Sequence, residues 1–430
     1  MRSPVGDANR KGKLLSGSFN EASFPLSLLR HHRQRLISKP SFSMPDRIPS
    51  SHSDITFSVP FIHRLRTTGD VCGHDYGVLG ELLDAGETGS ARVMLVSEKA
   101  LQSNAQRLAH QLAADANVEL VSETIWIDGG ETAKNTLDEI KSLLQAINAT
   151  NLDRRSYVIV VGGGAVLDAV GFAAAIAHRG IRLVRIPTTT LAQADSGVGV
   201  KNAINYFDKK NWVGTFAVPW AVFNDSKLLE SLPDRDFRSG FSEAVKVALL
   251  KDPKEFENLA KHAKDIHDRV PEVTQNAINR SCQLHLDHIT SGGDPFEMLE
   301  ARPLDFGHWS AHRLEPRTNF ELRHGEAVAI GVAIDCIYSS LVYGFPEDAA
   351  RRVCQCLHEI GIPLWHPAIN PIDELLIGLE EFRQHLGGRL TITMLQDLGC
   401  PINVHEIDEK QMREAIQRLD QWQQEAAHGS

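Results

Sequence analysis

The stretch that decides the fold runs from Tyr157 to Asp168 and reads Tyr-Val-Ile-Val-Val-Gly-Gly-Gly-Ala-Val-Leu-Asp. Its first five residues predict a buried strand, and the three glycines predict a tight turn. The alanine-rich segment from Leu167 to Ala177 then predicts a helix. Unpaired N–H groups at the start of that helix favour a pyrophosphate group. A tight turn without a ligand stays an alternative, because this is not the GxGxxG fingerprint.

Strands and helices alternate on both sides of this stretch. We expect strands at 55–59, 92–96, 124–127 and 182–186, with helices at 105–112 and 136–146. This alternation predicts an α/β N-terminal domain with a Rossmann-like parallel sheet over residues 51–232. Amphipathic helices dominate afterwards and predict a mostly α-helical C-terminal domain over residues 233–430, with helices at 242–250, 253–262, 271–288, 325–343, 347–360 and 410–425.

Residues 1–50 differ in composition from the rest of the chain. They are rich in serine, arginine and proline and show no sustained apolar period. A disordered tail, a transit-like peptide and an over-extended start with Met44 as the initiator all fit this composition. We favour the tail or the over-extended start.

Composition narrows the class of protein. The chain has 430 residues, 42% hydrophobic and 23% charged, with a net charge of -10. This charge argues against a general nucleic-acid binder, although local basic residues can hold a small phosphorylated substrate. No uninterrupted apolar run approaches the roughly 20 residues of a membrane-spanning helix. Six scattered cysteines match neither a disulfide framework nor a paired CxxC zinc site, which favours a reducing cytoplasm.

Three metal-type side chains fall in the second half of the chain. Glu243 lies in the segment 240–246, His308 lies in the segment 302–312 four residues before His312, and His324 opens His-Gly-Glu. One carboxylate and two imidazoles suit a catalytic divalent metal with an open coordination position. Together with a nucleotide-type turn in the first half, they predict redox chemistry on a metal-held hydroxyl. We expect the active site in the cleft between the domains.

A polar loop lies between these two features. Residues 186–202 are dense in hydroxyl groups and glycines, with one acid and one base at Asp195 and Lys201. Lys210 and Asn211 follow with another cation and an amide. Loops of this composition are often functional when they border a rigid sheet.

These motifs, in this order, resemble those of 3-dehydroquinate synthases, within the sugar phosphate cyclase superfamily. The shared patterns are Gly-Gly-Gly-x-x-x-Asp, Pro-Thr-Thr, Leu-Ala-Gln-x-Asp-Ser-x-Val-Gly-x-Lys, Lys-Asn, Gly-Phe-x-Glu-x-x-Lys, Gly-His-x-x-x-His and His-Gly-Glu. They span roughly residues 90–400. Polyol dehydrogenases of the iron type share the architecture and the glycine turn without this combination.

The resemblance implies a role for each matching residue. It implies a metal, usually zinc with cobalt as an alternative, on Glu243, His308 and His324. It implies NAD contacts at Glu98, Glu131, Lys134, Gly163, Gly164, Asp168, Thr188, Thr189 and Leu191. It implies a substrate pocket lined by Asp195, Lys201, Lys210, Asn211, Lys246, Arg302 and His312. It also implies a homodimer in which Arg179 reaches a phosphate across the interface.

Several positions depart from the synthase pattern. Asp305 replaces the usual asparagine, His288 stands where a lysine is expected about fourteen residues before Arg302, and 382–384 replaces Asp-Lys-Lys. In the synthases that lysine and the arginine hold the substrate carboxylate. The sequence of residues 302–309 is more similar to that of the EboD-type cyclases, which belong to bacterial operons linked to metabolite export. Half of this carboxylate clamp is thus altered, which favours sedoheptulose 7-phosphate, a substrate without a carboxylate, over the usual 3-deoxy-arabino-heptulosonate 7-phosphate.

The implied chemistry is an oxidation, an elimination of phosphate, a reduction, a ring opening and an intramolecular aldol closure, with NAD regenerated in each turnover. His312 fits a proton or phosphate contact, a fourth ligand or a structural hydrogen bond. Asp305 fits a second-shell acceptor or a hydroxyl contact. Two other functions stay open: an NAD-dependent polyol or alcohol dehydrogenase, and a catalytically silent cyclase-like protein.

Overall fold

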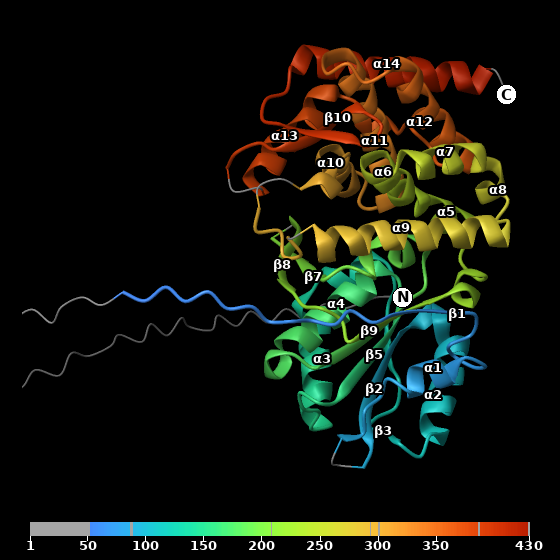
Figure 1. Cartoon of the computed structure of the whole chain (residues 1–430), viewed down its shortest axis with the longest axis vertical. Coiled ribbons are helices and arrows are strands. Elements are labelled where there is room, and N and C mark those ends of the chain that lie inside the picture. The colour runs from blue at the N-terminus through green and yellow to red at the C-terminus, as the bar shows by residue number, and fades with distance from the viewer. Residues whose placement is uncertain are drawn as a thin grey trace, which may run out of the picture. The chain divides into compact units, whose positions relative to one another are not determined.

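The computed structural model describes residues 52–86, 89–207, 209–292, 294–299, 302–385 and 388–428 (Figure 1). The extension predicted over residues 1–50 lies outside these ranges. Residues 60–430 fold as one compact unit, which contains every helix and strand of the described chain. Strands of one large sheet occupy the first half of this unit, and helices dominate from Asp234 onward.

The large sheet is parallel throughout. Its strands lie in the order β3-β2-β5-β6-β9-β1, and β4 also pairs with β2. The strands are β1 (Leu65–Thr68), β2 (Ala91–Glu98), β3 (Val118–Leu120), β4 (Ile125–Ile127), β5 (Tyr157–Gly162), β6 (Arg182–Pro187) and β9 (Ala221–Asp225). The central strands are rich in valine and isoleucine because helices cover both faces of the sheet.

Alternate residues of β5 face opposite layers of helices. Val158 and Val160 belong to the core cluster on the side of α3 and α4, whereas Ile159 and Val161 belong to the cluster on the side of α1 and α2. These helices are α1 (Tyr76–Gly80), α2 (Gln102–Ala114), α3 (Leu137–Ala149) and α4 (Gly164–Ile176). The predicted Rossmann-like sheet is therefore present, with helices on both faces.

This layering places a crevice at one point of the sheet. The helix after β2 covers one face and the helix after β5 covers the other, although β2 and β5 are neighbours. Chain directions diverge at such a point, and ligands of α/β folds bind there, beyond the carboxyl ends of the strands. Glu98 ends β2 and Gly162 ends β5, so both border this crevice.

A π-helix and a hairpin extend from the sheet. The π-helix η5 (Ala192–Ser196) precedes the antiparallel pair β7 (Lys201–Tyr206) and β8 (Lys209–Phe216). The side chain of Arg185, fully buried on β6, donates to the carbonyl groups of Gly197, Gly199 and Lys201. These bonds hold the polar loop against the sheet.

The second half surrounds one long buried helix, α11. Its helices are α5 (Asp234–Ser239), α6 (Phe241–Lys251), α7 (Pro253–Lys261), α8 (Ala263–His267), α9 (Pro271–Ser291), α10 (His308–Arg317), α11 (His324–Val342), α12 (Glu347–Ile360), α13 (Ile372–His385) and α14 (Glu409–His428), with the small pair β10 (Ile392–Asp397) and β11 (Cys400–Val404). Helix α9 joins this half to the sheet, because Cys282 packs with Val198 and Val222.

Helix α11 meets the length and composition of a membrane span, with 19 residues and a mean hydropathy of 1.5. However, 78% of the apolar stretch of this helix is buried inside the protein. A helix that is apolar all round and surrounded by other helices is typical of a core. We therefore interpret α11 as the core helix of the second half.

Some predicted elements were wrong or missing. Residues 55–59 form no strand, and Ile55 and Phe57 are largely exposed; the first strand begins only at Leu65. The predictions also missed β9, the β7–β8 hairpin, α10 and α13. In α10, Pro316 and several polar residues interrupt the apolar period on which helix prediction depends.

Candidate active site

Three helix starts bring the predicted metal ligands together. Glu243 lies in the first turn of α6, whereas His308 and His324 are the first residues of α10 and α11. Their ligand-type atoms all lie within 4.8 Å of one another. Nε2 of each histidine is 3.7 Å from Oε1 of Glu243.

Two glycines allow this close approach. At Gly325 a Cβ would lie 2.1 Å from the carbonyl oxygen of Ser239, so α11 can start against the end of α5 only without a side chain there. Gly307 has a φ of 79°, and a Cβ would lie 2.7 Å from the backbone nitrogen of Val332. This left-handed conformation strongly favours glycine. The Gly-His and His-Gly pairs of the sequence thus have steric causes.

Hydrogen bonds orient both imidazoles. Nδ1 of His308 is 3.2 Å from the carbonyl oxygen of Phe306, and Nδ1 of His324 is 3.1 Å from Oε2 of Glu315. In each ring Nδ1 then donates, which leaves the Nε2 lone pair directed toward Glu243. Such outer partners commonly fix the tautomer of metal-binding histidines.

The electrostatics of this cluster favour a cation. Both carboxylate oxygens of Glu243 are buried and have no hydrogen-bond partner in the part of the chain that the structure describes, although the ammonium of Lys246 contacts Oε2. Burial raises the pKa of Glu243 and lowers the pKa of His308. Desolvation thus penalises a charged carboxylate here, and a positive ion at this point offsets that penalty. The donor set therefore fits a divalent cation with an open coordination position.

The residues with an implied NAD role border the crevice of the sheet. Oε2 of Glu98 accepts a hydrogen bond from the backbone N–H of Gly163 at 3.2 Å. Lys134 is buried, and its ammonium lies 2.7 Å from the carboxylate of Asp168. The remaining positions with this role lie at the start of α4 or after β6, at Gly164, Thr188, Thr189 and Leu191.

Glu131 also reaches this region. Its Oε1 accepts a hydrogen bond from Asn205 at 2.8 Å. Burial opposes the charge on Glu131, but Lys210 and Lys134 hold the pKa of the carboxyl below its usual value. Lys134 is therefore one of two cations whose charge acts on Glu131 beside the hairpin.

The β7–β8 hairpin links this crevice to the metal-type cluster. The side chain of Asn211 accepts a hydrogen bond from Lys134, and the ammonium of Lys210 lies 2.5 Å from Oε1 of Glu315. Glu315 is buried and also contacts His324. Burial works against its charge, yet Lys210 and His324 keep the pKa of Glu315 below its usual value. Sequence reasoning missed Glu315, although it lies two helical turns after His308.

A narrow pocket lies beside Glu243. It is lined by Ala194, Asp195, Glu243, Lys246, Val247, Ser281, His285 and Leu304. Nδ1 of His285 is 2.8 Å from Oδ1 of Asp195. Asp195 and Lys246 thus fall in one pocket with Glu243.

Two histidines of α9 lie near the predicted site residues. His285 lines the pocket, and His288, to which the fourteen-residue spacing before Arg302 pointed, lies one helical turn later on α9. The charges of Glu297 and Lys201 act on His288. Burial lowers the pKa of His288 to about 4, so this imidazole is neutral at pH 7.

The other predicted site residues have varied surroundings. Lys201 and Arg302 both contact Glu297, which sequence reasoning also missed. The ring of His312 lies 5.3 Å from that of His308. Arg179 is exposed after the end of α4, and the structure shows no contact between it and the other predicted site residues.

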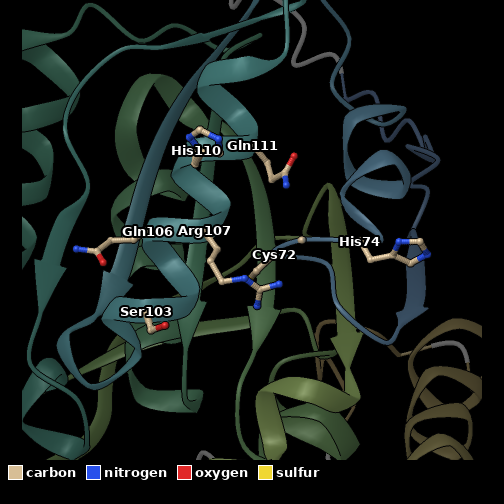
Figure 2. Close-up of a pocket in the computed structure, with 8 residues that line it drawn as sticks. Cys72, His74, Ser103, Gln106, Arg107, His110 and Gln111 are labelled. Carbon is tan, nitrogen blue, oxygen red and sulfur yellow. The ribbon is translucent and has the colours of Figure 1, made fainter.

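A more open pocket lies elsewhere, on the sheet half (Figure 2). Figure 2 shows Cys72 and Arg107 side by side in it, with His110 and Gln111 from the same helix as Arg107. Arg107 is paired with Asp70, and burial raises the pKa of the Cys72 thiol to about 12. This pocket contains none of the predicted site residues, so we do not assign the chemistry to it.

Comparisons with known proteins show which sequences and structures this chain resembles. Residues 124–239 match the family model of the 3-dehydroquinate synthase N-terminal region, and residues 240–380 match that of its C-terminal region. A 3-dehydroquinate synthase of Coxiella burnetii is 32% identical over 296 residues, which are 69% of this chain and 82% of the relative. A 2-epi-valiolone synthase of Actinosynnema mirum is 31% identical over 335 residues, which are 77% of this chain and 86% of the relative.

A solved structure extends the comparison. The 2-epi-5-epi-valiolone synthase of Streptomyces hygroscopicus, with NAD⁺ and Zn²⁺ bound, superposes with a TM-score of 0.78 at 26% identity. The match covers 86% of this chain and 99% of that chain. The α/β half and the helical half therefore recur together in a sugar phosphate cyclase.

Proposed function

Because the chain belongs to the 3-dehydroquinate synthase family, we propose that it is an NAD- and divalent-metal-dependent sugar phosphate cyclase that converts a heptulose phosphate into a carbocycle and releases phosphate. The observation that carries this proposal is the convergence of Glu243, His308 and His324 within 4.8 Å. A crevice suited to a dinucleotide is connected to them through Lys210 and Glu315. The alternative function is that of a polyol dehydrogenase, and measurement of phosphate and NADH distinguishes the two.

We propose that this chain binds the same kinds of cofactor as its structural relative, NAD and a divalent metal, which we expect to be zinc. Glu243, His308 and His324 would hold the metal, and the residues around the glycine turn would hold NAD. Bound there, the metal would polarise substrate hydroxyl groups, and NAD would accept a hydride and return it.

The residues of the chain itself would bind and orient the sugar phosphate. Lys246 is buried beside Glu243, where its fixed charge stabilises an oxyanion that develops in the pocket. Asp195, oriented by the hydrogen bond with His285, accepts a hydrogen bond from a substrate hydroxyl. Lys210 and Asn211 contribute a cation and an amide from the hairpin. This arrangement provides mainly positioning and charge stabilisation.

We also propose a homodimer in the cytoplasm. Arg179 follows the end of α4, is exposed and has a φ of 64°. An exposed arginine at a fixed backbone position suits a contact with the partner's substrate phosphate. The six cysteines are all unpaired, and five are buried, which agrees with a reducing compartment.

The test is incubation of the purified protein with NAD and each of two substrates, sedoheptulose 7-phosphate and 3-deoxy-arabino-heptulosonate 7-phosphate. We expect phosphate and a cyclised product from at least one of them, without net formation of NADH. Stoichiometric NADH without phosphate would identify a dehydrogenase. If there is no reaction and the purified protein contains no metal, the chain is a catalytically silent cyclase-like protein.

A further inference from the structure

An internal carboxylate occupies two of the cations near the pocket. The ammonium of Lys201 forms an ion pair with Oε1 of Glu297, and a guanidinium nitrogen of Arg302 lies 3.7 Å from Oε2 of the same carboxylate. Less than a quarter of the Glu297 side chain is exposed. Two cations around one carboxylate form an anion site whose anion belongs to the protein itself.

The backbone around Glu297 is held in place by its neighbours. The carboxylate of Asp294 accepts hydrogen bonds from the N–H groups of Met298 and Leu299 at 2.6 and 2.9 Å. The ring of Phe296 packs at 5.6 Å from that of Phe216 on β8. Glu297 itself has a φ of 51°, a conformation that costs a non-glycine residue energy and is often found at functional positions.

A further acidic group lies near Lys201. Although 58% of the Lys201 side chain is exposed, the carboxylates of Asp305 and Glu297 raise the pKa of its ammonium, so both carboxylates act on this cation. The one imidazole that lines the pocket, that of His285, is already paired with Asp195. A carboxylate brought by a substrate would therefore compete with Glu297 for Lys201 and Arg302 and would face negative charge.

A donor nevertheless remains. Nε of Arg302 is buried and finds no hydrogen-bond partner among the described residues. A neutral hydroxyl group can accept from this N–H without repulsion by Glu297. The position therefore keeps the means to recognise an uncharged polar group.

We propose that Glu297 is a specificity-determining residue, which fills the place of a substrate carboxylate between Lys201 and Arg302 and thereby selects sugar phosphates that carry a hydroxyl group there. This inference rests on the proposed cyclase function and narrows its substrate class to carboxylate-free heptulose phosphates. A carboxylate at this position would require Glu297 to leave both cations.

The test measures phosphate release by the full-length protein with NAD and metal, using sedoheptulose 7-phosphate and 3-deoxy-arabino-heptulosonate 7-phosphate. The wild-type protein should prefer the substrate without the carboxylate. Glu297→Gln keeps the shape of the side chain and removes its charge. We expect it to shift the ratio of kcat/KM values toward the carboxylate substrate by about tenfold or more, mainly through KM.

Control variants separate this effect from general damage. Glu257→Gln removes an exposed carboxylate that also pairs with an arginine, Arg352, and should leave the ratio unchanged. Glu297→Ala provides a second variant, and NAD binding checks that both variants are folded.

Three outcomes would overturn the proposal. They are a wild-type preference for the carboxylate substrate, an unchanged ratio in a folded Glu297 variant, and no phosphate release from either substrate by the wild-type protein. Only the last of these would also overturn the proposed function.

Discussion

At the scale of single residues, the types of the metal-binding side chains could be predicted, but their supporting contacts could not. Glu243, His308 and His324 have the chemistry of ligands wherever they lie. The carboxylate that orients His324 is Glu315, and only the packing of α10 against α11 makes this visible. The same is true of Phe306, whose carbonyl group orients His308.

Removing the charge of Glu243 should remove the metal. Glu243→Gln replaces one donor oxygen by an NH₂ group, so we expect loss of bound metal and a fall in phosphate release of about 100-fold or more. Elemental analysis of dialysed protein measures the metal content of each subunit. Glu257→Gln serves as the matched control, and full metal occupancy in Glu243→Gln would exclude Glu243 from the ligand set.

Substitution of Glu315, the hydrogen-bond partner of His324, should have a smaller effect on metal binding. In Glu315→Gln the side chain keeps its size but accepts less strongly from Nδ1 of His324, so we expect metal affinity to fall by about 10- to 100-fold. Competition with a chelator measures that affinity. Lys210→Met, which removes the other partner of Glu315, should weaken metal binding less. An unchanged affinity in Glu315→Gln would contradict this role.

At the scale of elements, the start of α10 depends on a buried carboxylate in α11. Oδ2 of Asp335 accepts from the N–H of Gly307 at 3.0 Å, and Oδ1 accepts from the indole of Trp309 at 2.8 Å. These residues flank His308. Asp335 is fully buried, so it fixes one metal-type ligand through the backbone of the preceding turn.

The pH dependence of stability should report on Asp335. Burial raises its pKa to about 7, although its two hydrogen bonds oppose the shift. Between about pH 4 and pH 7 the unfolded chain has then lost this proton while the folded chain keeps it, so stability falls as pH rises. The contribution is at most about 4 kcal/mol, by the usual conversion of pKa units to free energy.

Asp335→Asn cannot ionise and should therefore flatten this dependence. We expect the difference in unfolding free energy between the wild type and Asp335→Asn to shrink from pH 5 to pH 8. Denaturant unfolding at the two pH values measures it. An unchanged difference between the two pH values would mean that Asp335 is already ionised in the folded protein at pH 5.

At the scale of the whole molecule, one site draws on both halves of the chain. The crevice comes from the sheet, the metal-type cluster comes from the helical half, and the β7–β8 hairpin and α9 connect them. Substrate and nucleotide residues that are far apart in sequence therefore share one hydrogen-bonded network. In the proposed dimer, Arg179 would complete the site of the partner.

Mixing two inactive variants tests that completion. Arg179→Ala has an intact pocket without the partner's arginine, and Glu243→Gln has the arginine without a working metal site. If Arg179 acts across a dimer, mixed dimers contain one complete site, so we expect recovery of roughly a quarter of wild-type activity after subunit exchange. Sedimentation measures the oligomeric state. Absence of any recovery in demonstrated mixed dimers would contradict the shared site.

The sequence by itself determined the class of the fold, the position of the glycine turn and the identity of the metal-type residues. Apolar periodicity, glycine sterics and ligand chemistry are properties of short segments and survive without knowledge of the rest of the chain. Those short-range signals also located most long helices to within a few residues.

Only the tertiary structure decided which side chains meet. It placed His285 against Asp195, Glu297 between Lys201 and Arg302, and Glu315 beside His324. The contacts of Asp195 with His285 and of Lys201 with Glu297 join segments that are far apart in sequence, through connections whose path no local pattern encodes. Glu315 meets His324 only because α10 turns back onto α11. Charge pairing is decided at distances of a few ångströms, so it depends on the final packing.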